Sequence, residues 1–154
     1  ATVRGVPNEP GMAAKVFTLL AEAGVNVDMI VQASASTGTA DISFTVPGSA
    51  AAKVRDVLQE KQDELGYQSF DIDANVGKVA VVGVGMKTHS GLAAKFFNAL
   101  SDEGVNVLMI STSEIRIAAL VPLEQLQDAV RALHTAYGLD AEQVEAVVYG
   151  GTGR

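Results

Sequence analysis

The sequence GVNVDMI at residues 24–30 returns at residues 104–110 as GVNVLMI, with Leu108 in place of Asp28. The similarity extends towards the N-terminus, where GMAAKVFTLLAEA lies over GLAAKFFNALSDE, and 12 of the 20 aligned positions are identical. Self-similarity at a fixed spacing is the signature of a duplicated structural unit. We therefore expect two copies of one fold, and we refer to residues 24–30 and 104–110 as the first and second repeated segments.

The hydrophobic pattern predicts the same order of elements in both copies. Apolar residues that alternate with polar ones indicate strands, and apolar residues three and four apart indicate helices. These patterns fall at residues 3–6, 13–20, 25–32, 42–46, 54–65 and 70–72 in the first copy and at 79–84, 93–100, 105–111, 115–119, 123–133 and 144–148 in the second. Each copy therefore has the order strand, helix, strand, strand, helix, strand.

This order is that of the ferredoxin-like domain, in which helices cover one face of a four-stranded antiparallel sheet. We predict an α+β fold with a first domain at residues 1–75, a second domain at residues 76–149 and a C-terminal tail at residues 150–154. A domain of about 75 residues has only a marginal core of its own. We therefore expect the two halves, or two chains, to pair.

The composition argues against several classes of protein. The chain of 154 residues has a net charge of −7, which disfavours nucleic acid and anionic membrane surfaces as partners. It has no cysteine for disulfides or thiolate metal sites, and no apolar run long enough to cross a membrane. No signal peptide is recognisable, so we expect a cytoplasmic protein. The opening ATVRGV lacks an initiating methionine, which we interpret as a fragment or a processed chain.

The repeated segments are predicted to be strands with two different faces. Because side chains alternate along a strand, we expect Val25, Val27 and Met29 to lie beneath the helices. The other face would carry Asn26, Asp28, Ile30 and Gln32 in the first copy, and Asn106, Leu108, Ile110 and Thr112 in the second. Only the first copy therefore adds a carboxylate to this face.

A glycine-containing loop precedes the first predicted helix of each copy: PNEPG at residues 7–11 and KTHSG at residues 87–91. Backbone N–H groups at a helix N-terminus bind anions, including carboxylates. Such a loop beside Asp28 and Gln32 would suit a ligand with a carboxylate and an ammonium on one carbon, which is a free α-amino acid. The alternative is that Asp28 and Gln32 are ordinary polar residues on an exposed sheet.

Other motifs give weaker signals. GVGMKTHSG lacks the spacing of a phosphate-binding loop, and no spacing of metal ligands is present, so neither a cofactor nor a metal is expected. His89 could serve a small enzyme, but no carboxylate or serine recurs beside it and no catalytic residues are predicted. An RNA-binding sheet is disfavoured by the charge and by the lack of aromatic residues.

The segments KVFTLLAEAGVNVDMIVQ, EGVNVLMISTSEIRIA and EAVVYGGTGR closely resemble the regulatory region of bacterial aspartate kinases, which consists of tandem ACT domains. The resemblance covers essentially the whole chain, and ISTSEIRI and GTGR are its most specific motifs. It implies a non-catalytic chain that binds threonine, and in many members lysine, and so feedback-inhibits aspartate phosphorylation. It further implies side-by-side pairing of ACT domains, a homodimer, and an aspartate kinase catalytic subunit as partner.

The resemblance also implies which residues bind the effector. These are Asn8, Gly11, Ala13, Asn26, Val27, Asp28 and Gln32 in the first copy, and His89, Ser90, Asn106, Val107, Ser111, Thr112 and Ser113 in the second. In this family Asp often stands at the position of Asn8, Pro at that of Ser90 and an acidic residue at that of Leu108. We therefore expect a complete site around Asp28 and a weak or empty counterpart in the second copy.

Two roles follow from this interpretation, together with one alternative. Asp28 would hold the ligand ammonium and Gln32 would contact its side chain, while N–H groups of residues 8–11, or of their equivalents in a partner, would hold the carboxylate. The alternative is a dimerisation module of the same fold that binds no ligand.

Overall fold

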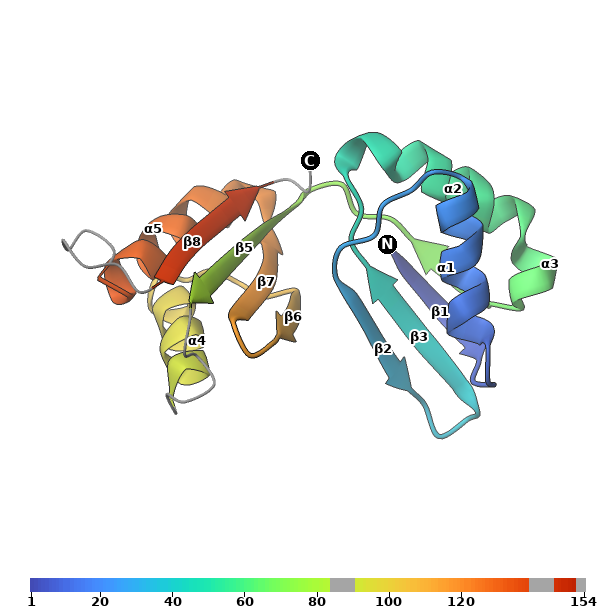
Figure 1. Cartoon of the computed structure of the whole chain (residues 1–154), viewed down its shortest axis with the longest axis horizontal. Helices are drawn as coiled ribbons and strands as arrows, with labels where there is room; N and C mark the ends of the chain where they lie inside the picture. Colours follow the sequence, from blue (N-terminus) through green and yellow to red (C-terminus); the bar gives the residue numbers. More distant parts are fainter. Residues whose placement is uncertain (84–90, 139–145, 152–154) are drawn as a thin grey trace. The chain divides into compact units, whose positions relative to one another are not determined.

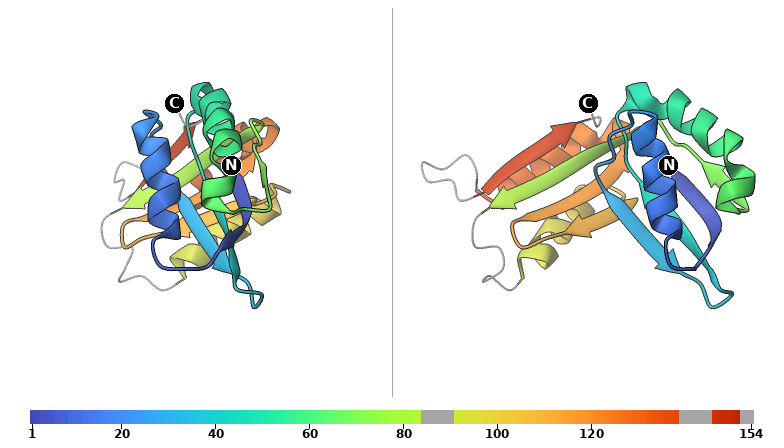
Figure 2. Two further views of the ribbon diagram at one scale, coloured as in Figure 1. Left: turned by 90° about the vertical axis from the view of Figure 1, so that its right-hand side faces the viewer. Right: turned by 45° about the vertical axis from the view of Figure 1, so that its right-hand side comes forward.

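The computed structural model describes residues 1–83, 91–138 and 146–151, the last of these through their backbone pairing. The described part of the chain forms two compact units, one at residues 1–74 and the other within residues 75–151. Each unit contains a four-stranded antiparallel sheet with its helices packed on one face (Figures 1 and 2). This confirms the predicted fold class of two ferredoxin-like domains.

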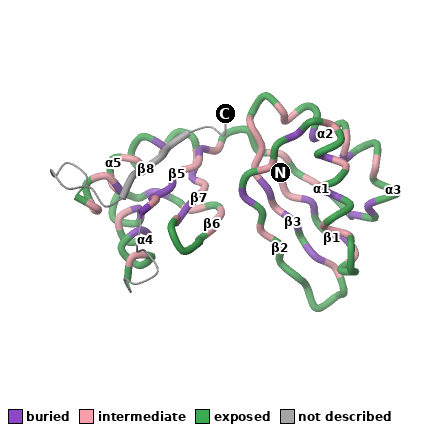
Figure 3. Tube along the Cα trace, viewed as in Figure 1, coloured by how far each residue is buried: buried purple, intermediate pink, exposed green. Residues whose placement is uncertain are grey.

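The first unit has the strand order β2-β3-β1-β4. Its elements are β1 (Thr2–Pro7), α1 (Met12–Glu22), β2 (Ile30–Ser34), β3 (Thr39–Phe44), the 3-10 turn η1 (Gly48–Ala50), α2 (Ala51–Glu60), α3 (Gln62–Leu65) and β4 (Ser69–Asp71). Both β1 and β2 pair antiparallel with β3, so β1 and β2 run parallel to each other. The edge strand β2 is exposed along most of its length (Figure 3).

The second unit repeats this arrangement with the order β6-β7-β5-β8. Its elements are β5 (Val76–Gly83), α4 (Leu92–Asp102), β6 (Met109–Thr112), β7 (Arg116–Pro122), the 3-10 turn η3 (Leu123–Gln125), α5 (Leu126–Ala136) and β8 (Ala146–Gly151). Strand β8 extends three residues beyond the end predicted for it, because its backbone still pairs with β5 as far as Gly151. Strand β6 is the edge that corresponds to β2.

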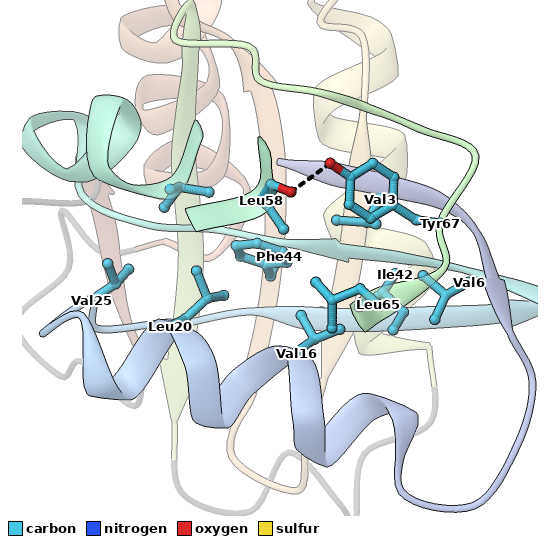
Figure 4. Close-up of a cluster of buried hydrophobic side chains, with 11 residues drawn as sticks. Val3, Val6, Val16, Leu20, Val25, Ile42, Phe44, Leu58, Leu65 and Tyr67 are labelled. Carbon is cyan, nitrogen blue, oxygen red and sulfur yellow. Dashed lines mark hydrogen bonds between the residues drawn. The ribbon is translucent and has the colours of Figure 1, made fainter. Parts of the chain in front are cut away.

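The core of the first unit lies between its helices and the helix-facing side of its sheet. Val16 and Leu20 of α1 and Leu58 of α2 are fully buried and meet Phe44 of β3 (Figure 4). The hydroxyl of Tyr67 donates a hydrogen bond to the carbonyl of Leu58 at 2.5 Å, so its one buried polar group is satisfied. Full burial of each large apolar side chain contributes about 1.5–3 kcal/mol.

The core of the second unit is built in the same way from Phe96 and Leu100 of α4 and Leu133 of α5. Here Tyr137 packs against the core and donates its hydroxyl to the carbonyl of residue 92 at 2.7 Å. The ammonium of Lys95 lies 4.8 Å from the centre of the Tyr137 ring, a cation–π distance.

The strand predicted at residues 25–32 begins later, at Ile30, because a β-bulge precedes it. Thr45 accepts a hydrogen bond from the N–H of Asp28 and donates its own N–H to the carbonyl of Met29, both at 3.0 Å. Two residues of one chain segment therefore oppose a single residue of the other. A bulge of this kind adds a residue and changes which face the following side chains occupy.

The bulge makes part of the predicted alternation wrong. Ile30 pairs with Phe44 and Gln32 pairs with Ile42, and both partners belong to the core beneath the helices. Directly paired residues of an antiparallel ladder share a face. Ile30 and Gln32 therefore lie on the helix side of the sheet and not on the opposite face, whereas Met29 is buried, as expected, but does not belong to this core cluster.

The second copy contains the same bulge. The N–H of Leu108 donates to the carbonyl of Leu120 at 2.8 Å, while Met109 pairs with the same residue. Ile110 and Thr112 are consequently paired with the core residues Ala119 and Ile117 and lie on the helix side, which corrects their predicted face.

Candidate functional site

Each repeated segment starts at the C-terminal end of a helix, and the same hydrogen bonds close both helix ends. The N–H of Gly24 donates to residue 21 at 2.9 Å and that of Val25 to residue 20 at 3.0 Å, and Gly104 and Val105 make the equivalent bonds. Both glycines adopt positive φ, at 77° and 67°, where glycine closes helices without strain. Both valines are then buried. The glycine and valine that open both repeated segments are thus explained by the fold, because the glycine ends the helix and the valine fills the core.

The next residues of the first repeated segment carry the predicted ligand chemistry. Asn26 and Asp28 are exposed, whereas Val27 is half-buried and packs against the core. Within the described part of the chain, the backbone N–H of Asn26 has no protein acceptor. We refer to Asn26, Val27 and Asp28 as the Asp28 half-site, which contains one carboxylate and the open N–H donor of Asn26.

The loop before α1 offers the opposite chemistry. Gly11 caps α1 at a φ of 90°, with no side chain bonded to the helix end and no acidic residue in the first turn. The first bond of the helical ladder runs from the N–H of Lys15 to the carbonyl of Gly11 at 2.9 Å. The N–H of Ala13 precedes this ladder and has no acceptor among the described residues. Open N–H groups at a helix start attract carboxylates. We refer to Asn8, Gly11 and Ala13 as the Asn8 half-site.

The two half-sites lie at opposite ends of β2. Asn8 bonds through its backbone N–H to the carbonyl of Gly38 at 3.0 Å and through its side chain to the hydroxyl of Ser34 at 3.3 Å, at the end where β2 turns into β3. Asp28 lies two residues before the start of β2 at Ile30. Asp28 and Ser34 are six residues apart along a largely extended segment, a span on the order of 20 Å. A single unit therefore does not bring the two half-sites together.

Gln32 lies between the two half-sites, exposed near the middle of β2. Its ladder partner is Ile42 of the neighbouring strand. Within one unit Gln32 therefore belongs to neither half-site.

In the second copy, Asn106 is exposed and Val107 is half-buried, as in the first. Ser111 is half-buried on β6, while Thr112 and Ser113 are exposed at its end. Ser113 shapes the turn that follows, because its N–H donates to the carbonyl of residue 116 at 2.7 Å and its hydroxyl accepts the N–H of residue 115 at 3.4 Å. His89 and Ser90 lie outside the described residues.

Two residues of the site region escaped sequence reasoning. Thr45 forms the bulge beside Asp28, and its hydroxyl also accepts the N–H of Met29 at 2.9 Å. Gln125 bonds through its side chain to the backbone of Gly104 and Asn106. Neither residue belongs to a repeated segment, and no sequence pattern links them to one.

Comparison with known proteins explains the duplication. A family model described as ACT domain matches residues 2–62 and again residues 79–137. A crystal structure of aspartokinase alpha and beta subunits superposes with a TM-score of 0.82 at 44% identity, over 89% of this chain and 90% of that chain. The ligand-free regulatory subunit of aspartate kinase from Thermus thermophilus gives a TM-score of 0.80 at 38% identity, over 88% and 89% of the two chains.

The chain belongs to the tandem ACT-domain regulatory regions of aspartate kinases. It is also 47% identical over 155 residues to the aspartokinase of Corynebacterium glutamicum, a match that covers 99% of this chain but 37% of that protein. The ACT units thus span little more than a third of this curated relative.

No helix in the described ranges is long and apolar enough to cross a membrane. Residues 1–83, 91–138 and 146–151 contain no group of three or more acidic or histidine side chains that could hold a metal ion.

Proposed function

We propose that this chain is the allosteric regulatory part of an aspartate kinase. It binds an end-product amino acid, threonine first and lysine as the second candidate, and thereby feedback-inhibits aspartate phosphorylation in the biosynthesis of lysine, threonine and methionine. In this proposal it has no catalytic activity of its own and acts in the cytoplasm as a homodimer on an aspartate kinase catalytic subunit. ACT domain 1 comprises residues 1–75 and ACT domain 2 residues 76–151, because β8 runs to Gly151.

The observation that carries this proposal is the complementarity of two half-sites that lie too far apart to cooperate within one unit. The Asp28 half-site presents a carboxylate suited to an ammonium, and the Asn8 half-site presents helix N–H groups suited to a carboxylate. The two charged groups of an α-amino acid sit on one carbon. Such a ligand therefore needs the Asp28 end of one ACT unit to meet the loop of another.

This requirement supplies the regulatory mechanism. A ligand that bridges two ACT units binds only the arrangement in which they are paired, and it shifts the equilibrium towards that arrangement. When the paired arrangement favours an inactive kinase, the amino acid inhibits. Coupling free energies in such systems are typically about 1–3 kcal/mol.

Calorimetric titration with threonine and with lysine tests the proposal, with oligomer size followed by sedimentation in the same samples. Asp28→Asn should abolish binding because it removes the charge that faces the ammonium, and the exposed position should leave folding intact. Asp56→Asn is the matched control, because Asp56 is an equally charged, exposed residue on α2. Wild-type affinity in Asp28→Asn would refute the assignment of Asp28.

A second candidate function is a dimerisation module without a ligand. It is favoured by large apolar side chains that remain exposed on or beside the edge strands: Ile30 at 49%, Leu108 at 48% and Ile110 at 47%. A stable dimer that responds to no amino acid would support this candidate over the sensor.

A further inference from the structure

The second repeated segment is fastened by the side chain of Gln125. Its Oε1 accepts the backbone N–H of Asn106 at 3.0 Å, and its Nε2 donates to the carbonyl of Gly104 at 3.0 Å. The orientation of the amide follows from its partners, because a backbone N–H can only donate and a carbonyl can only accept. Gln125 thus ties down both sides of Val105 at the start of the segment.

The first copy lacks this pair of side-chain hydrogen bonds, which we call the Gln125 clamp. Gln125 is the third residue of the 3-10 turn η3, which follows Pro122, and Ala50 is the third residue of the turn η1, which follows Pro47. The two residues therefore hold matching places between a strand and a helix. Alanine has no polar side-chain atom, so it cannot bond to the backbone of Asn26.

The first repeated segment is instead held at its far end. The hydroxyl of Thr45 accepts the N–H of Met29 at 2.9 Å. The residue that takes the place of Thr45 in the second copy is Leu120, which has no hydroxyl. Side-chain hydrogen bonds therefore hold the first repeated segment near its C-terminal end and the second near its N-terminal end.

This difference decides which backbone donor is open. The N–H of Asn106 is already bonded to Gln125, whereas the N–H of Asn26 has no acceptor in the described part of the chain. A ligand oxygen could bond to the N–H of Asn26 without displacing anything. At Asn106 the same ligand would have to break an existing hydrogen bond.

We propose that Gln125 closes the second repeated segment to amino acids, and that Ala50 leaves the first repeated segment open to receive the effector. Gln125 is then a specificity-determining residue, because it directs the ligand to the copy that contains Asp28. This inference rests on the proposed function. The two copies then differ for two reasons. The second copy has Leu108 in place of a carboxylate, and the N–H of its Asn106 is already bonded to Gln125.

The test moves the clamp from one copy to the other. Ala50→Gln should slow hydrogen exchange of the Asn26 amide and weaken threonine binding, each by about tenfold, the order expected from one or two exposed hydrogen bonds. Ser49→Gln is the matched control, because it adds the same side chain to an exposed neighbour in the same turn. Gln125→Ala should speed exchange of the Asn106 amide by about tenfold and leave threonine affinity unchanged.

A second experiment attempts to create a threonine site in the second copy, and it remains informative if Ala50→Gln unfolds its unit. Leu108→Asp alone should not create a new site, because Gln125 still occupies the Asn106 N–H. Leu108→Asp combined with Gln125→Ala should bind more threonine per chain than the wild type. A new site in Leu108→Asp alone would overturn the inference, and so would wild-type affinity in a folded Ala50→Gln variant whose Asn26 amide is protected.

Different results would overturn the proposed function and the role of Gln125. A wild-type chain that binds no amino acid in the presence of its kinase subunit overturns the proposed function, and this inference with it. Binding that is abolished by Asp28→Asn but unaffected by the clamp variants overturns only the role of Gln125 and Ala50.

Discussion

Asp28 donates its backbone N–H to the carbonyl of Thr45 at 3.0 Å, but Thr45 donates its own N–H to the next residue, Met29. One residue of the sheet therefore faces two residues of the repeated segment. This bulge allows Val27 before it and Ile30 after it to lie on the same side of the sheet. It also sets the position from which the Asp28 carboxylate is presented.

The hydroxyl of Thr45 should stabilise the bulge. Thr45→Val removes the acceptor for the Met29 N–H without changing the size of the side chain, so the free energy of unfolding should fall by about 1 kcal/mol. The Met29 amide should exchange faster. Thr45→Ser keeps the hydroxyl and is the control. Equal stability of the two variants in urea denaturation would show that the hydroxyl contributes nothing.

A side chain at Gly11 should lower stability through the backbone conformation alone. Its φ of 90° is left-handed, and a Cβ added there would meet no atom within 4 Å, so Gly11→Ala carries a conformational cost alone. That cost is about 1–2 kcal/mol of stability. Gly48→Ala is the control, because Gly48 has equally open space without a positive φ. Urea denaturation of both variants measures the difference, and an equal effect would contradict the argument.

Tyr67 should make the first unit sensitive to alkaline pH. Burial raises the pKa of its phenol above the ordinary value of about 10, because the charged form would lose its hydration. The folded state then retains the proton where the unfolded state loses it. The contribution of Tyr67 to stability is therefore fully present below about pH 10 and is lost as the pH rises through the folded-state pKa.

Tyr67→Phe provides the measurement for this pH dependence. It should lower stability at neutral pH by about 1 kcal/mol, because the bond to the Leu58 carbonyl is lost. It should also reduce the decline in stability between about pH 9 and pH 11. A decline as steep as that of the wild type would assign the alkaline effect elsewhere, for instance to Tyr137, whose phenol pKa burial also raises.

The exposed edge of the second unit should contribute to self-association. Ile110 lies on the edge strand β6 and is 47% exposed. Burying one such side chain at an interface is worth roughly 1.5–3 kcal/mol, so Ile110→Lys should weaken dimerisation by at least about tenfold. Leu123→Lys is the control, since Leu123 is also exposed but lies on η3, where its N–H donates to the carbonyl of Asn75 beside the inner strand β5. Sedimentation equilibrium that gives equal dimer constants for both variants would exclude this edge from the interface.

The repeat, the order of the elements and the helix ends could be predicted because each follows from local rules. Helical spacing in residues 13–20 and 93–100 gave the buried stripes of α1 and α4. Gly24 and Gly104 ended those helices because glycine adopts the left-handed conformation without strain. The burial of Val25 and Val105 and the exposure of Asn26 and Asp28 followed from the same short segments.

The sequence by itself thus determined that one fold occurs twice and that the two copies differ by a carboxylate. The tertiary structure alone decided the face of Ile30, because the bulge depends on Thr45 in another strand. It also separated Asn8 from Asp28, because β1 and β2 run parallel on either side of β3. Gln125 reaches Asn106 from a turn 19 residues away. These contacts join residues distant along the chain, and no local periodicity encodes which of them meet.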